Sequence, residues 1–397
     1  MKIISVVGAR PNFMKIAPFI HAINSYNSEK TYKQKIQHIL VHTGQHYDIS
    51  MSSTFFEELN IPSPDFNLEI GSGSHAEQVG YTMIAFEKIL QLEKPDWVVL
   101  VGDVNATLAC SVTAKKENIK CCHIEAGLRS SDLNMPEEIN RLVTDRLSDL
   151  LLTPDKISSE NLKKEGETDE KIVFVGNIMI DTLENNRVKA SKLSFERILS
   201  SNVYSENQYK LNAFQDSTPY GLITMHRPSN VDKKPILESI LNWFINDAAI
   251  QIPLIWPIHP RTVKQIVSFG LWDKLKNCEK LLLLNPIGYL EMLKLNLNAK
   301  VMLTDSGGLQ EECCVLGTPF LTLRKNTERP VTLIKYGGAG YLVGNNIKNI
   351  KRDFDIIMKQ KRVEQRPELW DGKTAGRCLD AILNYKENDS GKQDRFQ

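Results

Sequence analysis

Residues 123–141, which read HIEAGLRSSDLNMPEEINR, gather acidic and basic side chains directly after a short apolar run. Three carboxylates and two guanidinium groups stand among them: Glu125, Glu137, Glu138, Arg129 and Arg141. Glu125 follows Cys121, Cys122 and Ile124, which predict the interior of a strand. An unpaired carboxylate there would cost several kcal/mol or take up a proton. Glu125 is therefore a stronger candidate for acid–base chemistry than for a structural role.

Glu137 and Glu138 also admit a structural interpretation. Asn134, followed three residues later by Glu137, resembles a capping box in which the glutamate reaches back to the backbone. Glu137, Arg141 and Asp145 are four residues apart, as in an exposed ion-pair ladder on a helix. The pattern leaves both interpretations open for Glu137 and favours the structural one for Glu138.

The composition of the 397 residues is that of a soluble globular protein, with 42% hydrophobic and 24% charged residues. The length predicts two or three domains. A net charge of +1 does not indicate a nucleic-acid partner or an anionic membrane surface. No apolar run approaches the roughly 20 residues that span a bilayer.

The seven cysteines lack zinc-site spacing and a regular disulfide framework. Met1 leads directly into the strand-like IISVV and Gly8, which is too short and wrongly flanked for a signal peptide. We therefore expect a cytoplasmic protein with reduced thiols and no metal site.

Short apolar runs alternate with helical patterns in the first half of the chain. The runs are residues 3–7, 36–41, 97–101, 119–124 and 150–153. This alternation predicts an α/β fold, in which crossover helices cover a parallel sheet. Ligands of such sheets bind beyond the carboxyl ends of the strands. Arg10, His42, Asp103 and Glu125 follow strand ends, so we expect them to face one crevice.

A second alternating series predicts a second sheet of the same kind. Its apolar runs are residues 221–225, 252–258, 281–284, 301–304 and 319–323. We expect two Rossmann-like, doubly wound domains, residues 1–182 and 183–372, that face a central cleft. Residues 373–397 are expected to form a helix that packs back toward the N-terminal domain, and a polar tail.

The segment Ser306-Gly307-Gly308 follows a strand and opens a helix. The unpaired backbone N–H groups of a helix start attract phosphate, and glycines let a ligand approach the backbone. Glu312, one turn later, could accept both hydroxyls of a ribose. The glycines could instead serve an ordinary tight turn. No Walker-type lysine and no GxGxxG near the N-terminus are present, which disfavours a P-loop nucleotide and a nicotinamide cofactor.

Four basic residues could supply the charge that a diphosphate needs. Arg10 and Lys15 open the first helix, where cations oppose the helix dipole and therefore need an anionic partner. His226 and Arg227 close a strand of the second half, although they could also be a helix cap or a surface pair. A nucleoside diphosphate bound between the halves would give all four a common role.

Ten short motifs follow one another in a consistent order along the chain. They are GARPNFMKIAP (8–18), HTGQH (42–46), GD (102–103), HIEAGLR (123–129), MPEEINR (135–141), VGN (175–177), HRPSNVD (226–232), TDSGGLQEE (304–312), TERP (327–330) and LVG (342–344). Together they resemble the motifs of the non-hydrolysing UDP-N-acetylglucosamine 2-epimerases.

The resemblance implies a GT-B-like architecture, a UDP-N-acetylhexosamine substrate, no metal, no cofactor and a homodimer. It implies acid–base roles for Asp103, Glu125 and Glu137, with His226 near the diphosphate or the leaving oxygen. The residues it implies for binding UDP or the sugar are Arg10, Lys15, Arg227, Met292, Ser306, Gly307, Gly308, Glu312 and Arg329. Of these, Met292 would face the uracil.

The implied reaction eliminates UDP across C1–C2 to a 2-acetamidoglucal and re-adds it with the opposite configuration at C2. The hydrogen at C2 lies beside no carbonyl, so cleavage of the C1–O bond must precede or accompany its removal. Carboxylates on both faces of the ring are then required, and cations must stabilise the departing UDP. The product would supply surface polysaccharide synthesis.

The same residues are also compatible with other functions. A hydrolysing 2-epimerase would share the carboxylates but release free N-acetylmannosamine and UDP. An epimerase of a modified sugar, a GT-B glycosyltransferase and a catalytically silent nucleotide-sugar sensor are further alternatives.

Overall fold

The first half of the chain is built on a parallel sheet. The computed structural model describes residues 1–44 and 59–386, without the side chain of Arg10. Within these ranges, seven strands are paired in the order β3-β2-β1-β4-β5-β6-β7. They are β1 (Lys2–Val7), β2 (Gln37–His42), β3 (Phe66–Asn67), β4 (Trp97–Val101), β5 (Lys120–Ile124), β6 (Leu150–Thr153) and β7 (Ile172–Phe174). The helices of this half are α1 (Arg10–Ser28), α3 (His75–Glu93), α4 (Asn105–Lys116), α5 (Pro136–Leu147), α6 (Lys156–Lys164) and α7 (Ile178–Ser191).

The second half repeats this plan. Among the described residues, six parallel strands follow the order β10-β9-β8-β11-β12-β13. They are β8 (Gly221–Thr224), β9 (Leu254–Pro257), β10 (Leu281–Leu284), β11 (Val301–Thr304), β12 (Phe320–Thr322) and β13 (Gly340–Leu342). Its helices are α8 (Phe195–Asn202), α9 (Pro228–Val231), α10 (Lys234–Trp243), α11 (Ala249–Gln251), α12 (Pro260–Ser268), α13 (Trp272–Lys276), α14 (Tyr289–Asn298), α15 (Gly307–Leu316) and α16 (Ile347–Ile357).

Several strands are buried along their whole length, both at the centre of a sheet, as β4 is, and at its edge, as β10 is. Strand β4, WVVLV, and strand β10, LLLL, expose none of their residues. A parallel strand covered by helices on both faces buries successive side chains on opposite sides, so it reads as an uninterrupted apolar run. In β1, for example, Ile3 and Val7 pack into one core cluster, whereas Ile4 and Val6 pack into another.

Each sheet reverses its strand order at one point, between β1 and β4 in the first and between β8 and β11 in the second. Such a switch point opens a crevice at the carboxyl ends of the strands. Asp103 follows β4, while His226 follows β8 and Ser306 follows β11. The topology therefore places the predicted catalytic segments at the two crevices.

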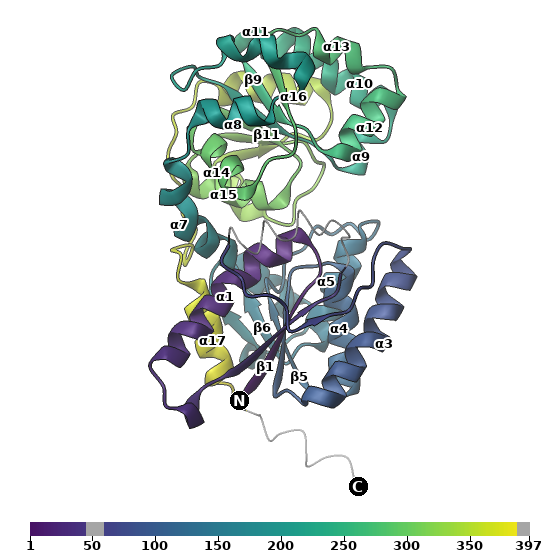
Figure 1. The fold of residues 1–397 in the computed structure, drawn as a ribbon, viewed down its shortest axis with the longest axis vertical. Helices are drawn as coiled ribbons and strands as arrows, with labels where there is room; N and C mark the ends of the chain where they lie inside the picture. Colours follow the sequence, from purple (N-terminus) through teal and green to yellow (C-terminus); the bar gives the residue numbers. More distant parts are fainter. Residues whose placement is uncertain (45–58, 387–397) are drawn as a thin grey trace.

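The two sheets lie one above the other, with helix α7 running between them (Figure 1). Helix α17 (Thr374–Leu383) returns from the second half and lies beside α1 (Figure 1). The Asp181 carboxylate of α7 accepts the backbone N–H groups of Thr374 and Ala375 at 3.0 and 2.7 Å. The Trp370 indole donates to the Pro154 carbonyl at 2.9 Å. These contacts attach the final helix to the first half.

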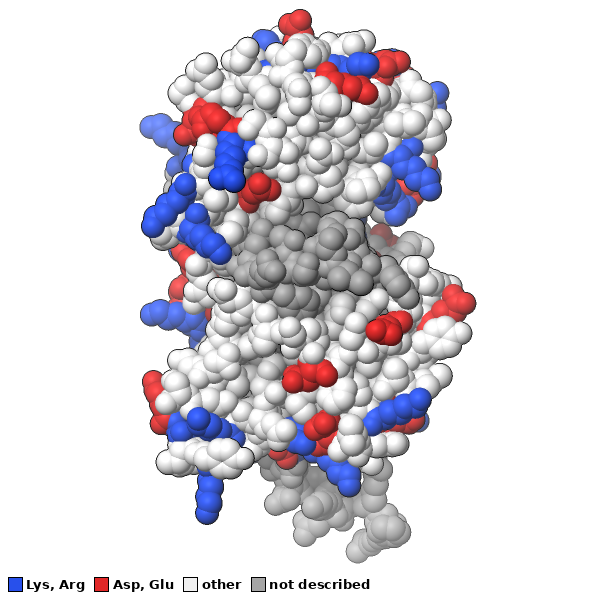
Figure 2. All heavy atoms as spheres, in the orientation of Figure 1, with Lys and Arg blue, Asp and Glu red and all other residues white. Residues whose placement is uncertain are grey.

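Helices of the described ranges are too short or too polar to cross a membrane. On the face drawn in Figure 2, basic and acidic side chains are interspersed. The predicted architecture of two doubly wound parallel sheets is confirmed.

Candidate active site

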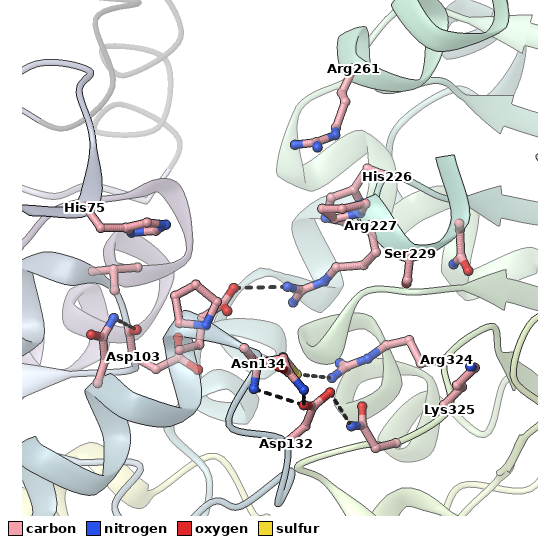
Figure 3. Close-up of a pocket in the computed structure, with 18 of the residues that line it drawn as sticks. His75, Asp103, Asp132, Asn134, His226, Arg227, Ser229, Arg261, Arg324 and Lys325 are labelled. Atoms are coloured by element: carbon pink, nitrogen blue, oxygen red, sulfur yellow. Dashed lines mark hydrogen bonds and ion pairs between the residues drawn. The ribbon is translucent and has the colours of Figure 1, made fainter. Parts of the chain in front are cut away.

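A cavity of about 650 Å³ lies between the two halves. The first half contributes Asp103, Asp132 and Glu137 to its wall, and the second half contributes mainly basic groups: His226, Arg227, His259, Arg261, Arg324 and Lys325. Figure 3 shows His226 and Arg227 pointing across the cavity toward the side that carries Asp103 and His75. One guanidinium N–H of Arg227 donates to Glu137 Oε1 at 3.1 Å, so an ion pair already spans the cavity.

Glu125 lies at the carboxyl end of β5 in a strained conformation, with a φ of +74°. Left-handed backbone is uncommon for residues other than glycine and clusters at functional sites. The side chain is buried and forms an ion pair with Lys15 of α1. Its second oxygen, Oε1, has no hydrogen-bond partner among the described residues. The strand end thus presents one paired and one available carboxylate oxygen.

Asp103 forms an ion pair with Arg141 of α5, and the same guanidinium pairs with Glu138. Glu138 also accepts the backbone N–H groups of Ser130 and Ser131 at 3.0 and 2.8 Å. Burial alone would raise the pKa of Glu138, but these hydrogen bonds and Arg141 lower it overall. Glu138 therefore holds the loop before α5 and orients Arg141 toward Asp103.

Both structural patterns predicted for Glu137 are wrong. Helix α5 begins at Pro136 with Met135 as its N-cap, so the expected capping box with Asn134 does not form. The ion-pair ladder is also absent from the described contacts of α5, because Arg141 turns to Glu138 and Asp103. Glu137 instead lines the cavity and meets Arg227 from the opposite half.

Asp305 orients His226 through contacts with its backbone N–H and its ring. The backbone N–H of His226 donates to Asp305 at 3.0 Å, the N–H of Arg227 donates at 2.8 Å, and the His226 ring Nδ1 lies 3.2 Å from Asp305 Oδ1. Burial alone would raise the pKa of Asp305, but His226 and the other donors lower it overall. The ring also lies 5.2 Å from the ring of His259. The His226 imidazole is therefore fixed in orientation, and it lines the cavity.

Ser306 is the N-cap of α15, and Gly307 and Gly308 begin the helix. A Cβ at Gly307 would lie 2.5 Å from Arg329 Nη1 and 2.7 Å from Glu328 Oε1, so a larger residue there would displace this ion pair. Arg329 packs beneath this turn, in ion pairs with Glu311 and Glu328. The predicted strand–turn–helix geometry forms at Ser306-Gly307-Gly308, the segment expected to be a phosphate loop, and Arg329 packs beneath it.

The remaining predicted UDP-binding residues of the second half do not line the 650 Å³ cavity in the described structure. Glu312 is buried in α15, where burial raises its pKa to about 8 although the Tyr289 hydroxyl opposes the shift. Met292 packs against a core cluster that includes Leu295 and Cys313.

Three predicted features lie outside the described residues, namely the side chain of Arg10, the end of the HTGQH motif, residues 45–46, and the end of the polar tail, residues 387–397. His42 is the last residue of β2, one position earlier than expected, and its ring packs against Phe13 at 5.4 Å. It does not reach the cavity wall that the described residues form.

The two halves are electrostatically coupled around Arg329. Burial alone would lower the pKa of Arg329, but Glu311 and Glu328 raise it overall, and Glu125 and Asp103 of the first half contribute in the same direction. The acidic strand ends of one half therefore lie within electrostatic reach of the phosphate loop of the other. This arrangement can hold an anion on one side and exchange protons on the other.

Asp305 and Glu311 are functional candidates that sequence reasoning missed. Both belong to the TDSGGLQEE motif, in which only Ser306, the glycines and the last glutamate were predicted to bind a ligand. Their carboxylates are buried and face residues distant in sequence, His226 and Arg329. Among the described residues, no group of three His, Cys, Asp or Glu side chains is placed to hold a metal ion.

Comparison with known proteins matches this geometry to one family. The family model for UDP-N-acetylglucosamine 2-epimerase covers residues 29–383. The UDP-N-acetylglucosamine 2-epimerase of Methanocaldococcus jannaschii is 42% identical over 97% of this chain and 99% of its own length. Its crystal structure in complex with UDP-GlcNAc and UDP superposes with a TM-score of 0.85, covering 97% of this chain and 100% of that one.

A further relative differs in its named substrate. The UDP-2,3-diacetamido-2,3-dideoxy-D-glucuronate 2-epimerase of Pseudomonas aeruginosa is 40% identical over 87% of this chain and 88% of its own length. The fold is GT-B-like, as in the solved epimerases. With sequence, fold and the two-sided cavity in agreement, the chain belongs to the UDP-N-acetylglucosamine 2-epimerase family.

Proposed function

We propose that this protein interconverts UDP-N-acetylglucosamine and UDP-N-acetylmannosamine without hydrolysis. The observation that carries the proposal is the cavity of about 650 Å³, where Asp103 and Glu137 of one half face His226 and Arg227 of the other. Acid–base groups and anion-binding groups on opposite walls match a sugar joined to a diphosphate.

The second half holds the diphosphate in this proposal. The N-terminus of α15 offers backbone N–H groups to phosphate, and Arg227 and His226 stand at the cavity wall. The proposed UDP- and sugar-binding residues are those expected from the sequence: Arg10, Lys15, Arg227, Met292, Ser306, Gly307, Gly308, Glu312 and Arg329. The sugar then points toward the acidic strand ends of the first half.

The chemistry is an elimination followed by a re-addition. UDP leaves with the electron pair of the C1–O bond, a carboxylate removes the C2 proton, and a C1=C2 double bond remains. UDP then returns to C1 while a proton is delivered to the opposite face of C2. Asp103, Glu125 and Glu137 are the proposed proton carriers, and His226 stabilises or protonates the departing phosphate oxygen.

The test is incubation with UDP-N-acetylglucosamine alone in heavy water. We expect deuterium at C2 of both epimers and no accumulation of free sugar in proportion to turnover. Release of free N-acetylmannosamine and UDP would identify a hydrolysing enzyme. Absence of exchange without an acceptor would favour a glycosyltransferase or a silent sensor. A parallel reaction with the substrate named for the Pseudomonas aeruginosa relative tests a modified sugar.

The same assay tests the role of Glu125. Glu125→Gln should abolish exchange at C2, because the amide cannot accept the proton, while UDP affinity stays close to that of the unmodified protein. Asp181→Asn is the matched control, since Asp181 is also buried but caps α17. Loss of UDP binding or of folding in Glu125→Gln would instead support a structural role for Glu125.

We also propose that the protein acts as a homodimer in the cytoplasm, and that its product supplies surface polysaccharide synthesis. All seven cysteines are free thiols, which supports a reducing compartment. Helix α3, the segment before α5 and α5 itself expose apolar side chains, which support a partner surface. These residues are Tyr81, Ile84, Leu92, Leu133 and Ile139.

A further inference from the structure

A buried histidine, His123, lies on β5 two residues before Glu125. The side chain is fully buried. Its ring Nδ1 lies 2.6 Å from Asp145 Oδ1, and its Nε2 lies 2.8 Å from the carbonyl oxygen of Gly102. Gly102 immediately precedes Asp103, so one imidazole connects the strand end that carries Glu125 with the strand end that carries Asp103.

Asp145 of α5 also contacts the residues that follow Glu125 in the chain. Its Oδ2 accepts the backbone N–H of Gly127 at 3.0 Å and forms an ion pair with Arg129 at 2.7 Å. The Asp145 carboxylate therefore contacts both His123 and Gly127. Glu125, whose backbone is in the left-handed region, lies between these two residues in the chain. Strained backbone persists only where the surrounding contacts hold it. The His123–Asp145 pair supplies those contacts.

The contacts of this pair require one more proton than a neutral imidazole and a carboxylate contain. Both ring nitrogens face oxygen atoms, and a neutral ring donates from only one nitrogen. Burial alone would raise the pKa of Asp145, but His123, Arg129 and the N–H of Gly127 lower it overall. The second oxygen of Asp145 accepts the N–H of Gly127 and pairs with Arg129, so the geometry is that of an ionised carboxylate and places the extra proton on the ring. Arg129 in turn pairs with Glu165, so the four charges balance.

We propose that His123 and Asp145 are positioning residues, in which a buried imidazolium–carboxylate pair fixes Asp103 and Glu125 relative to each other. This inference rests on the proposed acid–base roles of those two carboxylates. His123 and Asp145 are both buried, and neither lines the 650 Å³ cavity. The pair acts on the rate because displacement of a proton-transfer group by about 1 Å can cost up to a hundredfold.

The kinetic test is His123→Gln, whose side chain cannot donate in two opposite directions. We expect kcat for C2 exchange to fall at least about tenfold, while KM and UDP affinity stay close to wild type. The matched control is His38→Gln. His38 lies on β2 of the same sheet and contacts Ser5 Oγ at 3.0 Å, remote from both carboxylates. Its variant should keep kcat even if its stability falls.

A measurement on the unmodified protein covers the case in which His123→Gln does not fold. Nitrogen-15 NMR of labelled histidine at about pH 8, where ordinary histidines are neutral, should show one ring with both nitrogens protonated. That signal should survive in His38→Gln. A spectrum with only neutral rings, or a His123→Gln kcat equal to that of His38→Gln, would overturn the proposal. If the unmodified protein shows no C2 exchange, the proposed function fails instead, whatever the NMR result.

Discussion

Two adjacent glutamates of α15, Glu311 and Glu312, show how burial sets the charge of single residues in this site. Burial raises the pKa of Glu311 to about 7, against the opposing effect of Arg329. Burial likewise raises the pKa of Glu312 to about 8. The Glu312 carboxyl therefore holds a proton at neutral pH, whereas Glu311, which forms an ion pair with Arg329, is only partly protonated there. A ribose bound at Glu312 would meet a group that can donate as well as accept.

The raised pKa of Glu312 predicts a pH-dependent stability. Its ordinary value is 4.5, so between about pH 4.5 and 8 the folded state binds more protons than the unfolded state. Stability should then fall as the pH rises through that window. Glu312→Gln removes this effect, so its Tm should exceed that of the wild type by several degrees at about pH 8 and match it near pH 4.5.

The neighbouring residue provides the control for that experiment. Glu311→Gln removes the ion pair with Arg329 beneath the phosphate loop and should therefore lower Tm. Thermal unfolding across the pH range distinguishes the two variants. Parallel stability curves for Glu312→Gln and the wild type would contradict the raised pKa.

At the scale of elements, the sequence predicted the fully buried strands almost to the residue, the edge strand β10 included, and missed the partly exposed edge strands. The apolar runs at residues 97–101 and 301–304 are β4 and β11 as observed. Central parallel strands are covered on both faces, so their whole length is apolar. The unpredicted strands are short or partly exposed edge strands without such a run: β3, β7 and β13.

The partners of the site residues were less predictable than the strands. Glu137 meets Arg227, and Asp305 meets His226, across large separations in sequence. The first contact depends on how the two halves face each other and the second on which strands are neighbours in one sheet, and local spacing carries no signal for either. The false capping box at Asn134 shows the same limit, because Pro136 at the start of α5 decided where the helix begins.

The turn after β4 gives a prediction for an element. Gly102 has a φ of +67°, and a Cβ there would lie 2.9 Å from Lys15 Nζ and 3.7 Å from Glu125 Oε2. Gly102→Ala should displace the amine that pairs with Glu125, in addition to the backbone strain of roughly 1–2 kcal/mol. We expect C2 exchange to fall at least about tenfold.

Gly270 is the matched control for Gly102. Its φ is +70°, but an added Cβ would meet nothing within 4 Å. Gly270→Ala therefore incurs the same backbone strain in open space, and its Tm should fall while kcat is kept. Equal losses of kcat in the two alanine variants would show that strain alone, and not contact with Lys15, limits position 102.

For the whole molecule, helix α3 connects the proposed dimer surface with the active site. Tyr81, Ile84 and Leu92 form an exposed stripe along α3, on the outer side of the first half (Figure 1). A groove of about 520 Å³ runs beside them between α3, α4 and α5. The same helix begins with His75 and Gln78, which line the cavity. A partner held on α3 would therefore steady one wall of the site.

The stripe predicts how the assembly can be broken. Ile84 is 58% exposed, and Ile84→Glu would place a charge in an apolar contact, where an unpaired charge is costly. Val267→Glu is the matched control, because Val267 is 56% exposed on α12 of the second half, away from the stripe. In sedimentation equilibrium, the wild type and Val267→Glu should have twice the mass of the chain and Ile84→Glu the mass of one. If Ile84→Glu is still a dimer, the interface lies on another surface. If the wild type is a monomer, the proposed dimer does not exist.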